Sequence, residues 1–498
     1  MFFTFRSALK TTRSHRLWPM RPARVQLRSA ALGALSFLLA VAFTNASGAQ
    51  ESGSDRPIAL VGGQLLDGYN AEPIHDSVIL IEGKTITAAG PRHSVDIPET
   101  ARVIDTRGKT VMPGLIDLHV HMEIIGHGDY KAYQEFLGGD RDKLRLAGEI
   151  AAKQSLRAGV TTVVDLGSTF ELLETRDRIK AGEIPGPRVL ASGPWISRMS
   201  LSGIMPGEAQ LVISSPEEAA ERTIELIDRG VDVIKAWVGL TRADYEAIVR
   251  EAHARGVQVH AHLYEPEQIR KAIDAGVDVL QHMGSAKNPA YERELVMEIA
   301  HKDLPVVQTI AHRIWVYPAT VDFPTRLENP ALRKDLPADW YAEFQRSFEH
   351  FHRNSYFREV KREMRLAKEA CRQFIEADAV MGVGTDGGSP MNFHSEAMWR
   401  EMSALVDCGM SEAQVISAAT KINGEILSSG VSNLMLLGGE RSFGTIEPGM
   451  LADVIVVDGN PLFDINRLAN VELTIKEGIP WYAEEHATPL LREIGRQF

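Results

Sequence analysis

The stretch RAGVTTVVDLG, residues 157–167, contains a helix end, a strand and a polar side chain in close succession. Gly159 stands where a helix commonly ends in the left-handed conformation, which glycine adopts without strain. The β-branched run after it is typical of a short buried strand. Asp165 closes the run. This stretch therefore predicts a strand that delivers a carboxylate to its carboxyl end.

The same pattern recurs along the chain as DRGVDVIKAWVG from Asp228, ARGVQVHAHL from Ala254 and DAGVDVLQHMG from Asp274. Helix starts lie between the repeats. Ser215 precedes Pro216 and Glu218 in a capping-box pattern, and Thr241 with Asp244 forms a second helix start. Helices that alternate with strands at this spacing predict an α/β fold with a parallel sheet, either closed or open.

Polar side chains end the strands of these four repeats: Asp165, Lys235, His260 and His282. The carboxyl ends of parallel strands meet at one edge, which carries the chemistry in α/β proteins. Any one of these residues is also explained as a satisfied core group or a solvated loop residue. Four of them in one architecture indicate a shared site.

A fifth strand candidate, AVMGVGTDGGSP at residues 379–390, ends in Asp386. Gly382 and Gly384 share one face of this strand and leave room for a close neighbour. Asp386 is either a site residue or a cap for the following helix, which we expect from about His394, and the sequence leaves both roles open.

The segment PGLIDLHVHM, residues 113–122, places two histidines one residue apart on a predicted strand. Because side chains alternate along a strand, Asp117, His119 and His121 share one face. Two imidazoles directed at one spot suit a metal ion, although paired histidines also occur on solvated edges. The segment alone therefore gives weak support for a metal site.

The first 50 residues resemble a secretory signal. They hold seven Lys and Arg and no acid, followed by an apolar run over residues 30–43 and a small-residue stretch suited to cleavage after Ala49. We therefore predict a signal peptide over residues 1–49, with Met20 as an alternative start, and a secreted or periplasmic protein. A retained membrane anchor is the alternative, but the run is shorter than the ~17 residues of a spanning helix.

The charge balance and the cysteines exclude several classes of protein. Removal of the seven basic residues would change the formal net charge from −12 to −19, which argues against a nucleic-acid partner. Cys371 and Cys408 are too few for a disulfide scaffold, and they either form one bridge or stay as two buried thiols.

Taken together, these motifs resemble the amidohydrolase superfamily, in its imidazolonepropionase-like and secreted Xaa-Pro dipeptidase-like branch. The resemblance runs from about Ile58 to Tyr482. PGLIDLHVHM looks like the first barrel strand of that family, VDVIKAWV the fourth, VQVHAHL and VLQHMG the fifth and sixth, and GVGTDGG the eighth. The flanking IALVGGQLLDG and GTIEPGMLADVIVVDGNPLFDI resemble a β-sandwich assembled from both chain ends.

The resemblance implies a (β/α)8 TIM barrel with a small β-sandwich domain. The expected boundaries are residues 58–112 for the first part of the sandwich, 113–438 for the hydrolase barrel and 439–485 for the second part. In such a barrel Ile116, Leu118 and Val120 would pack outward against helices.

The resemblance also implies a ligand set for two divalent ions: His119, His121, Lys235, His260, His282 and Asp386. His119, His121 and Asp386 would hold one ion, and His260 and His282 the other. Lys235, carboxylated on its amine, would bridge them. A hydroxide between the ions would attack an amide carbonyl, and Asp386 would act as general base and then general acid. Zinc is the default metal. The alternatives are a single ion beside an unmodified lysine, and a lysine that extends out to the rim.

Candidate substrate-binding residues lie near the ends of the predicted strands: His262, Tyr264, Trp237 and His312, with His127 and two arginines, Arg198 and Arg313, proposed by position. A hydrophobic rim or a solvated loop explains each of them equally well.

The sequence thus predicts a secreted, metal-dependent hydrolase of amide C–N bonds in dipeptides or N-acyl amino acids, with oligomeric state open. The segment GPWISRMSLSGIMPGEAQ lacks the Gly-Gly-His turn expected of dipeptidase members, which weakens the assignment of their substrates. A cyclic amide, lactone or phosphotriester hydrolase is the alternative, and a non-catalytic binding protein is the alternative of another class.

Overall fold

The computed structural model describes residues 56–69, 72–200, 207–284, 290–329, 335–349, 351–429 and 442–482. The predicted signal peptide lies outside these residues. Among the helices of the described residues, none has the length and apolar character needed to cross a bilayer. Cys371 and Cys408 are both buried free thiols, so the alternative of two unpaired cysteines is confirmed.

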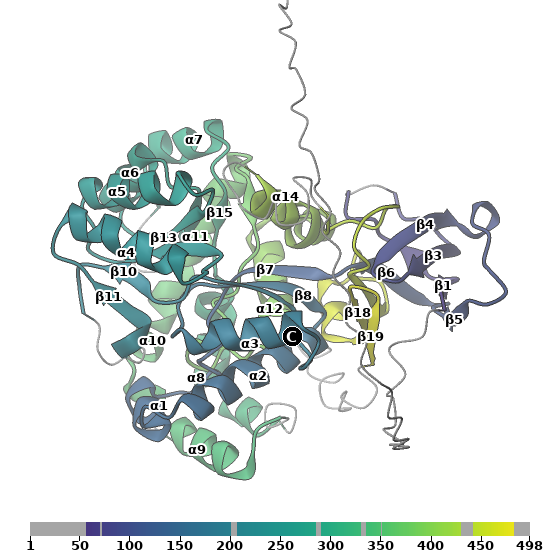
Figure 1. Cartoon of the computed structure of the whole chain (residues 1–498), viewed down its shortest axis with the longest axis horizontal. Coiled ribbons are helices and arrows are strands. Elements are labelled where there is room, and N and C mark those ends of the chain that lie inside the picture. Colours follow the sequence, from purple (N-terminus) through teal and green to yellow (C-terminus); the bar gives the residue numbers. More distant parts are fainter. Residues whose placement is uncertain are drawn as a thin grey trace, which may run out of the picture. The chain divides into compact units, whose positions relative to one another are not determined.

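Ten strands form two parallel sheets, which confirms the predicted α/β class (Figure 1). The three-stranded sheet contains β7 (Leu115–Val120), β8 (Val160–Asp165) and β9 (Arg188–Ala191). The seven-stranded sheet contains, in spatial order, β11 (Gln210–Val212), β10 (Trp195–Ser197), β12 (Val233–Ala236), β13 (Gln258–His262), β14 (Val279–Gln281), β15 (Val306–Val307) and β16 (Met381–Gly382).

Backbone hydrogen bonds join both edge strands of the three-stranded sheet to the seven-stranded sheet. The amide of Leu118 donates to the carbonyl of Val383 at 3.0 Å, just beyond β16. At the other edge the amide of Asp232, which precedes β12, donates to the carbonyl of Ala191 at 2.8 Å. The carboxyl ends of β7 and β12 to β16 therefore lie within one hydrogen-bonded set of strands.

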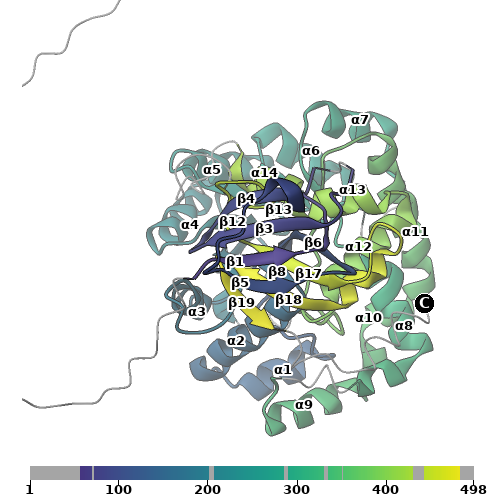
Figure 2. The ribbon, with the colours of Figure 1, turned by 90° about the vertical axis from the view of Figure 1, so that its right-hand side faces the viewer.

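Helices surround these strands in the view of Figure 2. They are α1 (Tyr130–Leu137), α2 (Arg141–Arg157), α3 (Glu171–Lys180), α4 (Pro216–Asp228), α5 (Arg242–His253), α6 (Pro266–Ala275), α7 (Arg293–His301), α8 (Tyr317–Asp322), α9 (Ala338–Phe348), α10 (Ser355–Arg358), α11 (Val360–Glu376), α12 (Ala397–Cys408), α13 (Glu412–Ser417) and α14 (Asn423–Ser428). A π-helix, His312–Val316, precedes α8. The helix expected from about His394 is α12, which begins at Ala397.

The helix ends follow the predicted signals. The glycines of the four repeats (Gly159, Gly230, Gly256 and Gly276) all have φ between 70° and 88°. The predicted capping box of Thr241 and Asp244 is present at the start of α5. At α4 the Ser215 hydroxyl accepts from the amide of Glu218, but the Glu218 carboxylate accepts from Ser214 instead of completing the box.

The packing of β7 agrees only in part with the prediction. Ile116 and Leu118 join a buried cluster that contains Ile426 and Leu427 of α14. The same cluster contains Val164, Leu190, Val233, Val279 and Val307 from the other parallel strands. The pairing of β7 with β8 shifts register between Asp117 and Val120, which interrupts strict alternation of the side chains. Val120 belongs to a different cluster, shared with the helices.

Two further sheets are built largely from the ends of the described chain. One has the order β4 (Thr85–Pro91), β3 (Ser77–Glu82), β1 (Ile58–Val61) and β5 (Arg102–Asp105). The other has the order β19 (Ile479–Tyr482), β18 (Val471–Lys476), β17 (Val454–Asp458), β6 (Lys109–Pro113) and β2 (Gln64–Leu65). Strand β17 pairs with β6 across this sheet, and the two sheets share one apolar core.

Candidate metal centre

Three predicted ligands converge at the carboxyl ends of the parallel strands. One ligand atom from each of His119, His121 and Asp386 lies within 4.8 Å of the others. The Oδ1 of Asp386 is 3.2 Å from Nε2 of His121 and 3.9 Å from Nε2 of His119. His119 on β7 and His121, the first residue after β7, thus approach Asp386 together.

Backbone geometry holds Asp386 in this position. Its φ is 57°, in the left-handed region, and its amide donates to the carbonyl of His119 at 2.8 Å. His282 also has a positive φ, 64°. Non-glycine residues in this region carry strain that the surrounding structure must offset, and such residues cluster at functional sites.

Close approach between strands explains why glycine stands at position 384. A Cβ added at Gly384 would lie 2.9 Å from the Cβ of His119 and 2.7 Å from Val307. At Gly382 it would lie 2.9 Å from a methyl group of Leu118. Both glycines leave the room that the sequence predicts, and this room allows β7 to carry His119 beside Asp386.

His282 and His262 extend the cluster. The ring centroid of His282 is 4.4 Å from that of His119 and 4.4 Å from that of His262. Burial lowers the pKa of both His262 and His282 well below the usual histidine value, and the nearby Lys235 charge acts in the same direction. Neutral imidazole is the form that binds a metal ion.

Lys235 lies on β12 with 1% of its surface exposed. Its Nζ has no hydrogen-bond partner among the described residues. Burial lowers the pKa of Lys235 to about 7, although the charges of Asp386 and Asp165 oppose the shift. Burying an amine that makes no hydrogen bond, beside four imidazoles, costs free energy of folding unless a ligand binds the amine.

His260 lies two residues before His262 on β13 and has different neighbours. It is paired in register with Lys235, and its Nδ1 lies 3.0 Å from the side-chain nitrogen of Gln281. The side-chain oxygen of Gln281 lies 2.8 Å from Nδ1 of His119. The structure thus links His260 to His119 through Gln281, whereas the ring of His262 contacts His282 directly.

The outer nitrogens of the histidines are engaged by protein groups. The Nδ1 of His282 is 2.8 Å from the Thr309 hydroxyl, and that of His121 is 3.3 Å from the Gly167 carbonyl. In contrast, the buried Nε2 atoms of His119 and His260 have no partner among the described residues. Metal-binding histidines typically use one nitrogen in this way and turn the other to the ion. The donor set therefore fits a divalent cation.

Asp386 is charged in this setting. Burial opposes its ionisation, but the hydrogen bond from His121 and the charges of His119 and His121 hold its pKa below the usual aspartate value. The carboxylate is therefore ionised at neutral pH, which is the form that binds a cation.

Aromatic side chains form one wall of the site. Trp237, a predicted substrate residue, stacks on Trp195 with centroids 3.9 Å apart. Trp195 meets His121 edge to face at 6.1 Å, and Trp237 meets His262 at 5.8 Å. Tyr264 also lies here, 4.6 Å from His262 and 5.5 Å from His282.

His312 begins the π-helix after β15 and is buried. Burial and the charge of Arg313 lower its pKa to about 3, while Asp386 acts in the opposite sense. Its Nδ1 has no hydrogen-bond partner among the described residues. This charge coupling places His312 within electrostatic range of the cluster.

The other candidates are engaged elsewhere. Arg198 forms an ion pair with Asp244 at 2.6 Å, and Arg313 forms one with Glu363, also at 2.6 Å. His127 packs against Tyr133, with ring centroids 5.2 Å apart. These contacts already account for the three side chains.

Sequence reasoning missed several residues that organise the site. Gln281 and Thr309 orient the imidazoles, and Trp195 forms half of the aromatic wall. The sequence predicts Asp165 only as a residue at a strand end. In the structure its carboxylate accepts a hydrogen bond from the amide of Met122 at 2.6 Å. A polar glutamine inside the apolar strand VLQ was the available signal for Gln281.

Comparison with known proteins agrees with this geometry. A family model described as "Amidohydrolase family" matches residues 110–479. Ochratoxinase from Aspergillus niger is 26% identical over 283 residues, which cover 48% of this chain and 57% of the relative. Enamidase from Eubacterium barkeri is 27% identical over 205 residues, which cover 40% of this chain and 48% of that protein. The chain thus spans about half the length of these curated relatives.

Solved structures match over a larger share. A candidate prolidase from Bifidobacterium longum aligns with a TM-score of 0.65 and 26% identity, over 89% of this chain and 99% of that chain. The family match covers most of the present chain, including all the clustered side chains. The chain therefore belongs to the amidohydrolase family.

Proposed function

We propose that this chain is a secreted, metal-dependent hydrolase that cleaves amide C–N bonds in small substrates, with dipeptides or N-acyl amino acids as the preferred class. The observation that carries this proposal is the convergence of His119, His121 and Asp386, with His282 against them and the amine of Lys235 buried nearby. Family membership supports the same reaction class.

The finer fold assignment is part of the proposal. We take the parallel strands to close into a (β/α)8 barrel, supported by the hydrogen bonds of β7 to the segment after β16 and of β9 to the start of β12. The two sheets built from the chain ends would form the β-sandwich, supported by their shared core. Site residues then come from the mouth of the barrel.

The metal site we propose uses the predicted ligands with one alternative. His119, His121 and Asp386 would hold one ion, His282 and a histidine of β13 a second, and Lys235 would bridge them as its carbamate. Carbamate formation requires a neutral amine, and burial supplies one by lowering the pKa of Lys235 to about 7. Bound divalent metal would polarise the substrate carbonyl and lower the pKa of a water molecule.

The metal ligand expected from β13 can be either of two histidines. His260 is the sequence prediction, and its unpartnered Nε2 supports it. His262 is supported by its ring contact with His282 and by the charges of Lys235, Asp386 and His121 that act on it. We favour His262 as the ligand, with His260 held by Gln281 as a support beneath the site.

The chain itself would handle the proton of the reaction at Asp386. Its ionised carboxylate accepts the proton released during attack on the amide carbon and donates it to the departing nitrogen. His121, 3.2 Å away, holds the carboxylate in place. Tyr264 and His312 would contact substrate groups, a proposal supported for Tyr264 by its ring contacts with His262 and His282.

The aromatic wall indicates which side chains the substrate carries. Trp195 and Trp237 present a stacked, largely apolar surface beside His121 and His262. Such a surface favours substrates that place an aromatic or large apolar group next to the scissile amide. Cyclic amides and lactones remain the second substrate class, and the alternative of a non-catalytic binding protein is opposed by the presence of every predicted ligand.

The test is turnover by metal-loaded mature protein on a panel of N-acyl amino acids and dipeptides with aromatic or small side chains. Asp386→Asn serves as the inactive comparison, because it retains the shape of the side chain and removes the base. Amide hydrolysis by wild type alone supports the proposal. Turnover restricted to lactones would replace the substrate class, and equal rates for both proteins would refute the mechanism.

Export is tested separately by N-terminal sequencing of protein recovered from outside the cytoplasm. We expect the chain to begin after Ala49. A start upstream of Ala49 would contradict the cleavage.

A further inference from the structure

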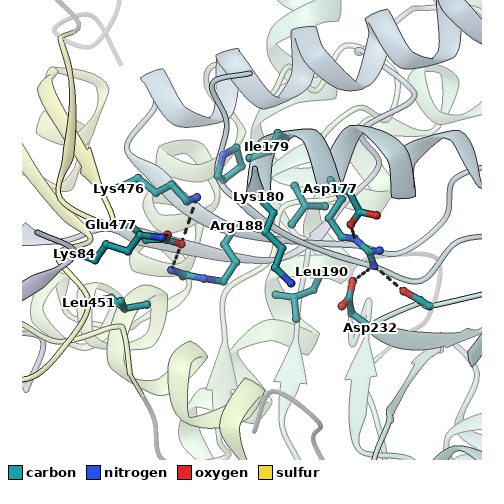
Figure 3. A pocket seen from close by; sticks show the side chains of 14 residues that line it. Lys84, Asp177, Ile179, Lys180, Arg188, Leu190, Asp232, Leu451, Lys476 and Glu477 are labelled. Carbon is teal, nitrogen blue, oxygen red and sulfur yellow. Dashed lines mark hydrogen bonds and ion pairs between the residues drawn. The ribbon is translucent and has the colours of Figure 1, made fainter. Parts of the chain in front are cut away.

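A cavity of about 550 Å³ lies where the amino-terminal ends of β9 and β12 meet the sheets built from the chain ends (Figure 3). Lys180 and Asp177 border it from α3, Arg188 from β9 and Asp232 from the residue before β12. The metal-site residues lie at the opposite, carboxyl-terminal ends of the strands. The cavity is therefore separate from the proposed catalytic centre.

Positive charge predominates in the lining of this cavity. Five cationic side chains border it, against three acidic ones: Lys84, Arg176, Lys180, Arg188 and Lys476, against Asp177, Asp232 and Glu477. The chain as a whole carries a formal net charge of −12. A cationic cavity in an acidic protein is a local departure that favours an anion.

The acidic groups neutralise the positive charge of this cavity only in part. Glu477 alone serves three cations, at 3.0 Å from Arg188, 3.2 Å from Lys84 and 3.4 Å from Lys476. The other two acids are engaged by Arg176, which is 2.9 Å from Asp177 and 2.7 Å from Asp232. Asp453, beneath the lining, pairs with Arg188 at 3.0 Å.

Lys180 is the cation without a partner. Within the described part of the chain its amine makes no ion pair or hydrogen bond, and Figure 3 shows the side chain extending from α3 into the space beside Arg188. Lys476 enters from the other side with only 12% of its side chain exposed. The exposed Lys180 and the largely buried Lys476 thus border one cavity, and of the two only Lys476 is paired with a carboxylate.

We propose that this cavity binds a small anion with two or more negative charges, carried by carboxylate or phosphate groups, through Lys84, Lys180 and Lys476. Its volume is in the range of sites that hold small molecules. The bound anion would join α3 to the turn between β18 and β19. This is a ligand site distinct from the hydrolytic centre, and it does not depend on the proposed function.

The test is isothermal titration of the metal-loaded full-length protein with tricarballylate and, separately, with inorganic phosphate, at an ionic strength held constant with sodium chloride. Metal content is measured after each titration, so that removal of metal is not mistaken for binding. We expect saturable binding of at least one probe, weakened about tenfold or more by Lys180→Glu. The stronger probe identifies the chemistry of the ligand.

Lys131→Glu is the matched control, because it makes the same charge change on α1 at a side chain that is 83% exposed. It should bind like wild type. Lys180→Gln guards against misfolding of the glutamate variant and should show an intermediate loss. No saturable binding of either probe, or equal weakening by Lys131→Glu and Lys180→Glu, would overturn the proposal.

Discussion

The side-chain oxygen of Gln281 lies 2.8 Å from Nδ1 of His119, and its nitrogen lies 3.0 Å from Nδ1 of His260. One buried amide therefore orients imidazoles from two strands. This contact fixes the rotation of His119 and leaves its Nε2 toward Asp386, at 3.9 Å, without a hydrogen bond from any described residue.

Gln281→Leu should weaken metal binding about 10- to 100-fold, because it removes the group that orients His119. The measurement is the metal dissociation constant by competition with a fluorescent chelator. Gln258→Leu is the control. It removes a buried amide that bonds the Ile426 carbonyl instead, and it should lower stability without changing metal affinity. Equal metal affinities for the two variants would show that Gln281 only fills space.

The two histidines of β13 give a direct comparison. If His262 is a ligand, His262→Asn should lower the bound metal by about one equivalent. His260→Asn should retain the metal, with only a modest loss of metal affinity. Plasma mass spectrometry on dialysed protein measures the difference. The reverse pattern would restore His260 as the ligand.

Gly384→Ala should lower both stability and metal content. The added methyl group would contact the Cβ of His119 at 2.9 Å and Val307 at 2.7 Å, and overpacking of this kind costs about 1–3 kcal/mol. Thermal unfolding and metal analysis measure the two effects. Gly90→Ala is the control, since its nearest contact is the Ser94 hydroxyl at 3.1 Å. A Gly384→Ala protein with normal metal content would contradict the close approach.

His253 provides a pH-dependent contribution to stability. Its hydrogen bond with Asp278, at 2.9 Å, raises its pKa above the usual 6.5, while burial acts in the opposite sense. Because the folded-state pKa is raised, the stabilisation is fully present below pH 6.5 and is lost as the pH rises through the folded-state value. Solvent screening keeps it below about 1 kcal/mol.

The measurement for His253 is the difference in melting temperature between wild type and His253→Gln across pH 5.5 to 8.5. The difference should be largest at the acidic end and shrink toward the basic end. His301→Gln, at an exposed histidine on α7, should show no such trend. A difference that grows with pH would contradict the assigned direction.

Much of the fold and the site is predictable because local rules determine it. Each repeat glycine ends a helix, so the strand after it and the residue at the strand's end follow from chain geometry. That is why Asp165, Lys235 and His282 fall at or next to the carboxyl ends of strands, whereas His260 lies in the middle of β13. The pair His119 and His121 is found from the spacing of the two histidines, although β7 ends at Val120.

What the sequence does not determine depends on contacts between distant segments. The shift in register between Asp117 and Val120 arises in the pairing with β8, and the cluster that Ile116 and Leu118 join combines other strands with α14. His260 and His262 share a face, so alternation cannot say which one reaches the cluster. The cationic cavity unites Lys84, Lys180 and Lys476, whose separation in sequence hides their proximity.

The central claim is that buried Lys235 completes a metal centre with the clustered histidines and Asp386. Its most direct test is the metal content of wild type and Lys235→Ala, both loaded with zinc in the presence of bicarbonate and then dialysed. We predict about two equivalents per chain for wild type and at most about one for the variant. Equal metal content in the two proteins would contradict the claim.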